Sequence, residues 1–132
     1  MPEVSIIVRT KNEEAWIGHC LEMIYQQDFK DFEIILVDNS STDNTLEIVR
    51  RFPVDLIVNI EKFLPGKALN KGILSSSGNY IVCISAHCIP KTTDWLSTLY
   101  RNFKSDDGLA GVYGRQLPLS YTTDIDKRDL LI

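Results

Sequence analysis

The stretch EIILVDNSSTDN, residues 33–44, runs from four apolar residues directly into a cluster of short polar ones. The apolar run at 34–37 is too short for a helix and rich in β-branched side chains, which predicts a parallel strand buried on both faces. The strand should end at Asp38, whose carboxylate then faces the crevice where open parallel sheets bind ligands. Two roles remain open for Asp38: a contact with a ligand, or a hydrogen bond that fixes the following turn.

The same alternation of apolar strands and amphipathic helices extends over most of the chain. Strands are predicted at residues 4–8, 34–37, 55–59, 80–84 and 108–113, with helices at about 13–24, 43–51, 65–77 and 93–103. We expect Asn12 to cap the first helix, Pro65 to open the third, and Gly78 to close the third in a left-handed conformation. The alternation predicts a three-layer αβα fold of Rossmann type with a mainly parallel sheet.

Length, charge and cysteine content limit the choice of function. A chain of 132 residues can bury one core, so we expect a single domain over 1–132 with an irregular tail from about residue 115. The net charge of -4, without any basic cluster longer than Arg50-Arg51, argues against nucleic acid as a partner. Three cysteines without a pairing pattern, no signal sequence and no membrane-spanning run favour a soluble cytoplasmic protein with reduced thiols.

Polar loops should meet at one edge of the predicted sheet. The segment RTKNEE, residues 9–14, follows the first strand, and the carboxyl ends of parallel strands lie on the same side. It should therefore converge with the loop after Asp38.

Lys67, in a first helical turn, opposes the helix dipole, so it has either an anionic partner or a solvent-exposed position. The phosphate-binding patterns GxGxxG and GxxxxGK[ST] are absent, so a phosphate would be held in another way.

Three segments carry a resemblance to a known family: VSIIVRTKNEEAWIGHCLEMIYQQ (4–27), DFEIILVDNSSTDNT (31–45) and PGKALNKGILSSSGNYIVCIS (65–85). Their order and spacing resemble the family-2 inverting glycosyltransferases with the GT-A fold, over nearly the whole chain. The resemblance implies transfer of a sugar from a nucleotide-diphosphate sugar to an acceptor hydroxyl. It also implies a UDP- or TDP-sugar as donor, a saccharide or lipid-linked acceptor, and a role in the synthesis of cell-surface polysaccharide or glycoconjugate.

The resemblance also assigns binding residues. Thr10, Glu13, Asp38 and the adjacent Asn39 would hold the nucleoside, and Lys67 and Asn70 would lie near the diphosphate. These roles are chemically reasonable, because Asp38 can accept the imide N–H of uracil or thymine and Glu13 can accept from ribose hydroxyls.

The chain departs from the family pattern after the fourth predicted strand. Similar enzymes carry an Asp-x-Asp there that binds Mg²⁺ or Mn²⁺, whereas this chain has Ser85-Ala86-His87. An imidazole suits Mn²⁺ better than Mg²⁺, so His87 could keep a weakened metal site. It could instead donate to the diphosphate, or bind neither. Dependence on a divalent metal is therefore open.

The resemblance implies that these residues are the donor-binding part of a longer enzyme. The general base would then lie beyond residue 132, while Asp124, Asp126 and Asp129 would belong to a solvated tail. Apolar surface around Tyr113, Leu117 and Leu119 could favour a homodimer, and the full enzyme could associate with membranes peripherally. Two alternatives remain: a non-catalytic nucleotide-sugar binding module, and an unrelated receiver-type signalling domain, which would need acids where Arg9 and Thr10 stand.

Overall fold

The computed structural model of the chain describes residues 1–62 and 64–118. Four strands alternate with four helices along the sequence. The strands are β1 (Val4–Thr10), β2 (Phe32–Asp38), β3 (Leu56–Asn59) and β4 (Tyr80–Ser85). The helices are α1 (Ile17–Tyr25), α2 (Thr45–Val49), α3 (Pro65–Leu74) and α4 (Trp95–Lys104). None of the helices in the described ranges has the length and apolar character needed to span a membrane.

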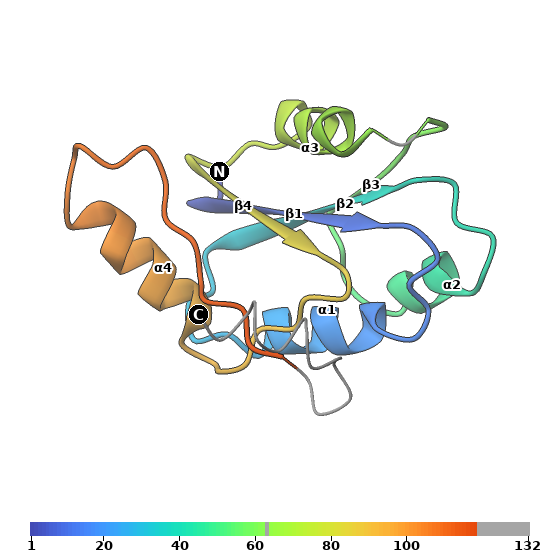
Figure 1. Cartoon of the computed structure of the whole chain (residues 1–132), viewed down its shortest axis with the longest axis horizontal. Coiled ribbons are helices and arrows are strands. Elements are labelled where there is room, and N and C mark those ends of the chain that lie inside the picture. Colours follow the sequence, from blue (N-terminus) through green and yellow to red (C-terminus); the bar gives the residue numbers. More distant parts are fainter. Residues whose placement is uncertain (63, 119–132) are drawn as a thin grey trace. The chain divides into compact units, whose positions relative to one another are not determined.

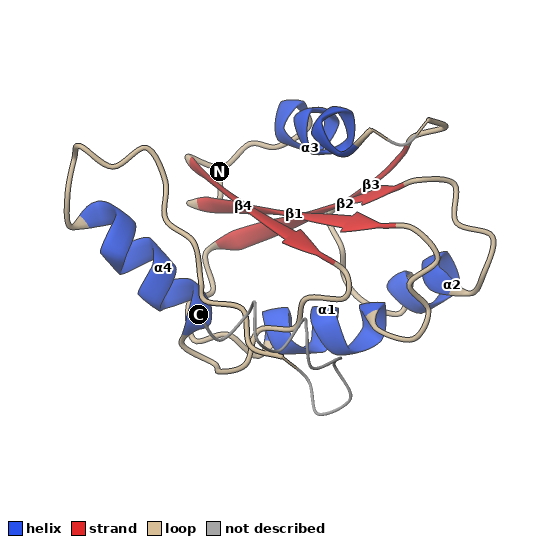
Figure 2. Cartoon of the chain, in the orientation of Figure 1, coloured by secondary structure: helices blue, strands red, loops and turns tan. Residues whose placement is uncertain are grey.

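All four strands are parallel and form one sheet in the order β3-β2-β1-β4 (Figure 2). The central pair, β1 and β2, consists almost entirely of buried residues, because helices cover both of its faces. The register places Thr10 beside Asp38 and Arg9 beside Ser85, so the ends of β1, β2 and β4 lie at one edge. This confirms the predicted α/β class and the predicted parallel sheet.

Helices lie on both faces of the sheet, with α3 on one side and α1 and α2 on the other (Figure 1). Beneath α3, Ala68 packs into a buried cluster with Ile7, Ile35 and Val37. Gly72 lets α3 approach the sheet closely, since a Cβ there would lie 2.5 Å from Ile7 Cγ2. Burying an aliphatic side chain of this size contributes about 1.5–3 kcal/mol, so these contacts hold the layers together.

The start of the first helix differs from the prediction. α1 begins at Ile17 and its N-cap position is Trp16, whereas Asn12 lies in the preceding loop with a positive φ of 49°. The side chain of Asn12 accepts a hydrogen bond from the backbone N–H of Thr42 at 2.8 Å instead of capping the helix. A contact between loops, which the local sequence does not reveal, thus replaces the expected cap.

Two further predictions are wrong. Residues 108–113 form no strand, so the sheet within the described residues has four strands instead of five. Gly78 does not close α3 in a left-handed conformation, because α3 ends at Leu74 and no described glycine has a positive φ. Pro65 does open α3, as predicted.

The chain divides into two compact units, of which the first is Met1–Ser97 and the second begins at Thr98. The sheet, helices α1 to α3 and every predicted binding residue belong to the first unit. The single domain over 1–132 stays a prediction. Leu119 and the predicted tail carboxylates Asp124, Asp126 and Asp129 lie outside the described residues.

Candidate functional site

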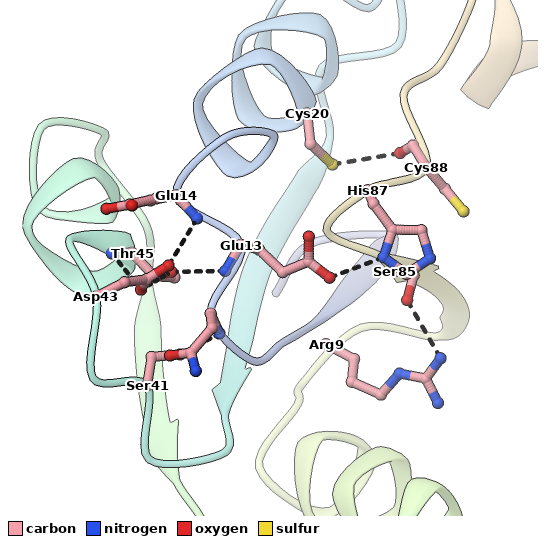
Figure 3. Close-up of polar contacts among 11 residues, drawn as sticks. Arg9, Glu13, Glu14, Cys20, Ser41, Asp43, Thr45, Ser85, His87 and Cys88 are labelled. Atoms are coloured by element: carbon pink, nitrogen blue, oxygen red, sulfur yellow. Dashed lines mark hydrogen bonds and ion pairs between the residues drawn. The ribbon is translucent and has the colours of Figure 1, made fainter. Parts of the chain in front are cut away.

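Side-chain hydrogen bonds join the loops that follow β1 and β2 at the carboxyl edge of the sheet (Figure 3). The backbone N–H of Asn12 donates to Ser41 Oγ at 2.9 Å, and that of Glu13 donates to Thr45 Oγ1 at 2.8 Å. The hydroxyl groups of Ser41 and Thr45 thus accept hydrogen bonds from the loop that follows β1. The predicted convergence of the two polar loops is confirmed.

A second set of contacts, around Asp43, reinforces the same junction. Asp43 accepts from the backbone N–H groups of Glu14 at 3.1 Å and Thr45 at 3.0 Å, and Glu14 accepts from the N–H of Asn44 at 3.0 Å. Desolvation opposes ionisation of Asp43, but the hydrogen bonds that it accepts from the hydroxyl and the N–H of Thr45 and from the N–H of Glu14 outweigh it and hold its pKa below the ordinary value. The junction is therefore stabilised by carboxylates bonded to backbone donors.

Asp38 is fully buried at the end of β2. Its carboxylate accepts from the backbone N–H of Ser41 at 2.9 Å and from Ser41 Oγ at 2.5 Å. Asp38 therefore fixes the turn after β2, which was one of its two predicted roles. Each carboxylate oxygen has more than one acceptor site, so these bonds leave capacity for a ligand donor.

Two buried oxygens at the strand ends, Thr10 Oγ1 and Asn39 Oδ1, have no hydrogen-bond partner among the described residues. Thr10 is 2% exposed and Asn39 is 6% exposed. Leaving a buried polar atom unsatisfied costs about 1–3 kcal/mol, so such atoms need a ligand or a water molecule as a partner. Both residues were predicted to hold a nucleoside, and their unmet hydrogen bonds agree with a ligand at this edge.

A hollow of about 100 Å³ opens at this edge. It is lined by Arg9, Thr10, Lys11, Glu13, Ser85 and His87. The volume accommodates several water molecules, and hence a group about the size of a phosphate. The structure thus brings together four of the predicted residues: Thr10, Glu13, Ser85 and His87.

The other predicted residues lie elsewhere. Asp38 and Asn39 are buried at the end of β2 and do not line the hollow. Lys67 and Asn70 are exposed on α3, and neither side chain has a hydrogen-bond or ion-pair partner within the described part of the chain. The structure therefore leaves Lys67 in solvent, which was one of its two predicted states, and its role near a diphosphate stays a prediction.

Sequence reasoning missed two cationic residues that line the hollow. Arg9 Nη2 donates to Ser85 Oγ at 3.2 Å, and Lys11 Nζ donates to the backbone carbonyl of Asn39 at 2.9 Å. A signal was present, because Arg9 interrupts an otherwise apolar strand just before its carboxyl end. Together they place two permanent positive charges at the hollow of a chain whose net charge is -4.

The residues at the hollow do not fit an ordinary Mg²⁺ site. Glu13 Oε1 and His87 Nδ1 bond to each other at 2.8 Å, and Ser85 Oγ accepts from the Arg9 guanidinium. Within residues 1–62 and 64–118, no group of three or more His, Cys, Asp or Glu side chains could hold a metal ion. Mg²⁺ requires near-octahedral oxygen ligands, which this set does not supply.

The cysteine next to His87 is not a nucleophile candidate. Cys20 Sγ donates to the backbone carbonyl of Cys88 at 3.4 Å, which fixes the segment after His87 against α1. Burial raises the pKa of Cys20 to about 12, and burial also raises the pKa of Cys88. All three cysteines are free thiols, as predicted.

A larger hollow, of about 330 Å³, involves only α1, α2 and the residues next to them. Its lining includes Gly18, Glu22, Ile48 and Phe52, and none of the strand-end residues. It offers neither the unpartnered Thr10 Oγ1 nor the two cations that line the strand-end hollow. The strand-end hollow is therefore the better candidate.

Comparisons with known proteins place this geometry in a family. The family model described as glycosyl transferase family 2 matches residues 5–128. One relative is the dolichyl N-acetyl-alpha-D-glucosaminyl phosphate 3-beta-D-2,3-diacetamido-2,3-dideoxy-beta-D-glucuronosyltransferase of Methanococcus voltae, 35% identical over 84% of this chain and 38% of its own length. Another is the GalNAc(5)-diNAcBac-PP-undecaprenol beta-1,3-glucosyltransferase of Campylobacter jejuni, 32% identical over 89% of this chain and 39% of its own length.

Solved structures agree with these relatives. S. aureus TarS 1-349 in complex with UDP-GlcNAc matches 89% of this chain and 37% of its own, with a TM-score of 0.71 and 28% identity. The mannosyltransferase PcManGT from Pyrobaculum calidifontis, in complex with GDP-Man and Mn²⁺, matches 80% of this chain and 33% of its own, with a TM-score of 0.73 and 30% identity. The chain thus spans less than two fifths of the length of these relatives. The family match excludes a receiver-type signalling domain. The chain belongs to glycosyl transferase family 2 and has the GT-A fold.

Proposed function

We propose that the chain forms the donor-binding part of a glycosyltransferase that moves a sugar from a nucleoside diphosphate to an acceptor hydroxyl. The observation that carries this proposal is the pair of buried, unpartnered oxygens, Thr10 Oγ1 and Asn39 Oδ1, at the carboxyl edge of the sheet. A nucleotide bound at this edge would supply the missing donors. Family membership and the nucleotide-sugar complexes of similar structures support the same ligand class.

We propose a UDP- or TDP-sugar as the donor. Asp38 and Asn39 Oδ1 are acceptors near the end of β2, and the imide N–H of uracil or thymine is a matching donor. Guanine also carries a ring N–H, so GDP belongs in any binding test. Glu13, whose carboxylate already meets His87, is proposed to accept from ribose hydroxyls.

The proposed reaction is an inverting, in-line displacement, in which the acceptor hydroxyl attacks the anomeric carbon as the nucleoside diphosphate leaves. Such a step needs a general base within hydrogen-bond reach of the acceptor hydroxyl. We assign this role to none of the described residues. The proposed acceptor is a saccharide or a lipid-linked saccharide, and cell-surface polysaccharide or glycoconjugate is the proposed product.

Cellular setting and assembly are also proposals. Three free thiols agree with a cytoplasmic location. Tyr113 is 94% exposed and Leu117 is 46% exposed, which agrees with self-association through an apolar surface. Peripheral membrane association would bring the full enzyme to a lipid-linked acceptor.

A second candidate is a nucleotide-sugar binding module without transfer activity. Ser85 and His87, at the positions of the expected carboxylates, favour it, because the residues at the hollow do not fit a Mg²⁺ site. Calorimetric titration with UDP-, TDP- and GDP-sugars separates the two candidates when donor consumption is also followed with a panel of acceptors. Both candidates bind a donor, but only the transferase consumes it in an acceptor-dependent way. Failure to bind any of these donors would contradict both.

A further inference from the structure

The larger hollow, of about 330 Å³, is lined by residues on and next to α1 and α2, which lie on the face of the sheet opposite α3 (Figure 1). Its floor consists of the partly buried Gly18, Ile48 and Phe52, whereas its other lining residues are exposed. It is therefore an open groove and not an enclosed cavity, and we call it the α1–α2 groove. Its residues all belong to the first compact unit.

The floor of the α1–α2 groove is apolar and fixed in place. Phe52 stacks on Tyr25, with ring centroids 6.1 Å apart and an angle of 6° between the ring planes. A Cβ on Gly18 would lie 3.4 Å from Ile48 Cγ2, an ordinary van der Waals contact, so packing does not require glycine here. Because glycine is a poorer helix former than alanine, Gly18 keeps the groove open at a cost to the stability of α1.

Two exposed carboxylates at the rim of the groove are bonded only to neutral donors. Glu14 Oε2 accepts from the backbone N–H of Asn44 at 3.0 Å. Glu22 Oε1 accepts from Gln26 Nε2 at 3.5 Å. Neither carboxylate has an ion-pair partner within the part of the chain that the structure describes.

The permanent cation in the lining does not balance these carboxylates. Arg51 Nη2 lies 3.2 Å from Glu47 Oε1, so its charge already has a carboxylate partner. His19, the remaining ionisable residue of the lining, carries no formal charge at pH 7. The rim of the α1–α2 groove is therefore negative and attracts a cationic group.

We propose that the α1–α2 groove is a docking surface for a basic amphipathic helix of a partner protein. A lysine or arginine can lay its aliphatic stem on the apolar floor while its charged end meets Glu14 and Glu22 at the rim. An arginine also fits a carboxylate with two parallel hydrogen bonds and stacks on an aromatic ring such as Phe52. Grooves between packed helices commonly receive an amphipathic helix. This docking does not depend on the proposed function.

Unspecific attraction between an acidic chain and any basic peptide makes different predictions. The whole chain has a net charge of -4, so some attraction is expected whatever the order of residues in the peptide. Docking in the groove requires apolar and basic side chains on the correct faces of a helix. It also requires the groove to be open.

The test is fluorescence anisotropy with a labelled peptide of leucine and arginine, ordered to form an amphipathic helix, in physiological salt. A peptide of the same composition in scrambled order is the comparison. The wild-type chain should bind the amphipathic peptide at least about tenfold more tightly than the scrambled one. UDP should not displace it, because no residue of the groove lines the strand-end hollow.

Substitutions at exposed positions of the lining test the location. Ala15→Trp places an indole in the groove and should weaken the amphipathic peptide by at least about tenfold. Glu22→Gln should weaken it by about twofold to fivefold, as expected for one exposed ion pair, and Glu22→Lys should weaken it further. The matched control is Glu61→Gln, which removes the same charge from an exposed residue outside the lining and should leave affinity unchanged.

Equal affinity for the scrambled peptide would overturn the inference, as would full affinity in both Ala15→Trp and Glu22→Lys or displacement by UDP. Binding of spermine as tight as that of the peptide would assign the groove to small polycations instead. Sedimentation of the chain alone tests the remaining occupant. A dimer that the peptide dissociates would assign the groove to a second copy of the chain and would likewise overturn the inference.

Discussion

Glu13 Oε1 and His87 Nδ1, 74 positions apart in the sequence, lie 2.8 Å from each other. The pair connects the loop after β1 to the segment after β4 across the mouth of the hollow. His87 is 54% exposed, so water screens the interaction. Exposed ion pairs contribute about 0.2–1 kcal/mol, so this contact adds little to the stability of the fold.

We therefore expect Glu13→Gln, His87→Ala and the double variant to show a coupling energy below about 1 kcal/mol in urea unfolding. The functional effect should be larger, because Glu13 is proposed to accept from ribose. Glu13→Gln should weaken a ribonucleoside diphosphate more than its 2′-deoxy form. Equal weakening of the two ligands would contradict the ribose contact.

Asp38→Ala tests the contact with the base. Asp38 is fully buried and accepts two hydrogen bonds from Ser41, so the substitution should lower the unfolding free energy by about 1–3 kcal/mol. If Asp38 also accepts from a pyrimidine, UDP or TDP affinity should fall by about 1–3 kcal/mol as well. Urea unfolding and calorimetry measure the two effects separately.

Ser41→Ala is the matched control for Asp38→Ala. It removes the hydroxyl bond of the same turn, together with the bond that the backbone N–H of Asn12 donates to Ser41 Oγ, and leaves the carboxylate in place. A base contact predicts that nucleotide affinity falls clearly more in Asp38→Ala than in Ser41→Ala. Similar losses in both variants would assign Asp38 to the turn alone.

The sheet could be predicted from the sequence because its signals are local. The apolar runs at the starts of β1, β2 and β4 need no knowledge of partners, and parallel strands bring their carboxyl ends together. The start of α1 could not be predicted, since Asn12 bonds to Thr42 in another loop instead of capping the helix. Residues 108–113 carried a strand-like pattern, yet the described structure has no strand there.

The site was predictable only in part. The resemblance to the family pointed to Thr10, Glu13, Ser85 and His87, and each of them ends or follows a strand. Arg9 was missed because the sequence alone does not show which residue lies beside a charged side chain in an apolar run. The strand register places Ser85 beside it. Lys11 was missed for a similar reason, since its anchor is a backbone carbonyl, which leaves no side-chain signal.

A pH-dependent contribution to stability should come from Glu33, at the opposite edge of the sheet. Its carboxylate accepts from Ser5 Oγ at 2.6 Å and from the backbone N–H of Ser77 at 2.6 Å. Desolvation alone would raise the pKa of Glu33, but these hydrogen bonds outweigh it and lower the pKa below 4.5. Because the folded-state pKa is lower than the unfolded-state pKa, this stabilisation is present above about 4.5 and is lost as the pH falls through the folded-state pKa.

Glu33→Gln should therefore lower the unfolding free energy by roughly 1 kcal/mol at neutral pH, and the difference from wild type should shrink as Glu33 becomes protonated. Urea unfolding at a series of pH values measures this difference. The exposed Glu61→Gln serves as the control and should differ little from wild type throughout. A difference for Glu33→Gln that does not vary with pH would contradict the assignment.

Gly78 should be required for the close approach of the chain before β4 to β1. A Cβ at Gly78 would lie 2.8 Å from the backbone N of Ser5 and 2.9 Å from the backbone C of Val4. These atoms belong to a central strand, and displacing them is energetically unfavourable. Gly78→Ala should therefore lower the unfolding free energy by about 1–3 kcal/mol. The N–H of Gly78 also donates to Ser5 Oγ at 2.8 Å, a bond that any shift would lengthen.

Gly66→Ala is the counterpart in the first turn of α3, where a Cβ would meet nothing within 4 Å. Alanine favours a helix over glycine by up to about 1 kcal/mol, so Gly66→Ala should be neutral or slightly stabilising. Gly78 lies at the amino edge of the sheet, opposite the hollow, so the folded fraction of Gly78→Ala should bind nucleoside diphosphate like wild type. Urea midpoints and calorimetry on both variants test this. An unchanged midpoint for Gly78→Ala would show that β1 and the turn before β4 can separate. The close approach would then not require glycine at this position.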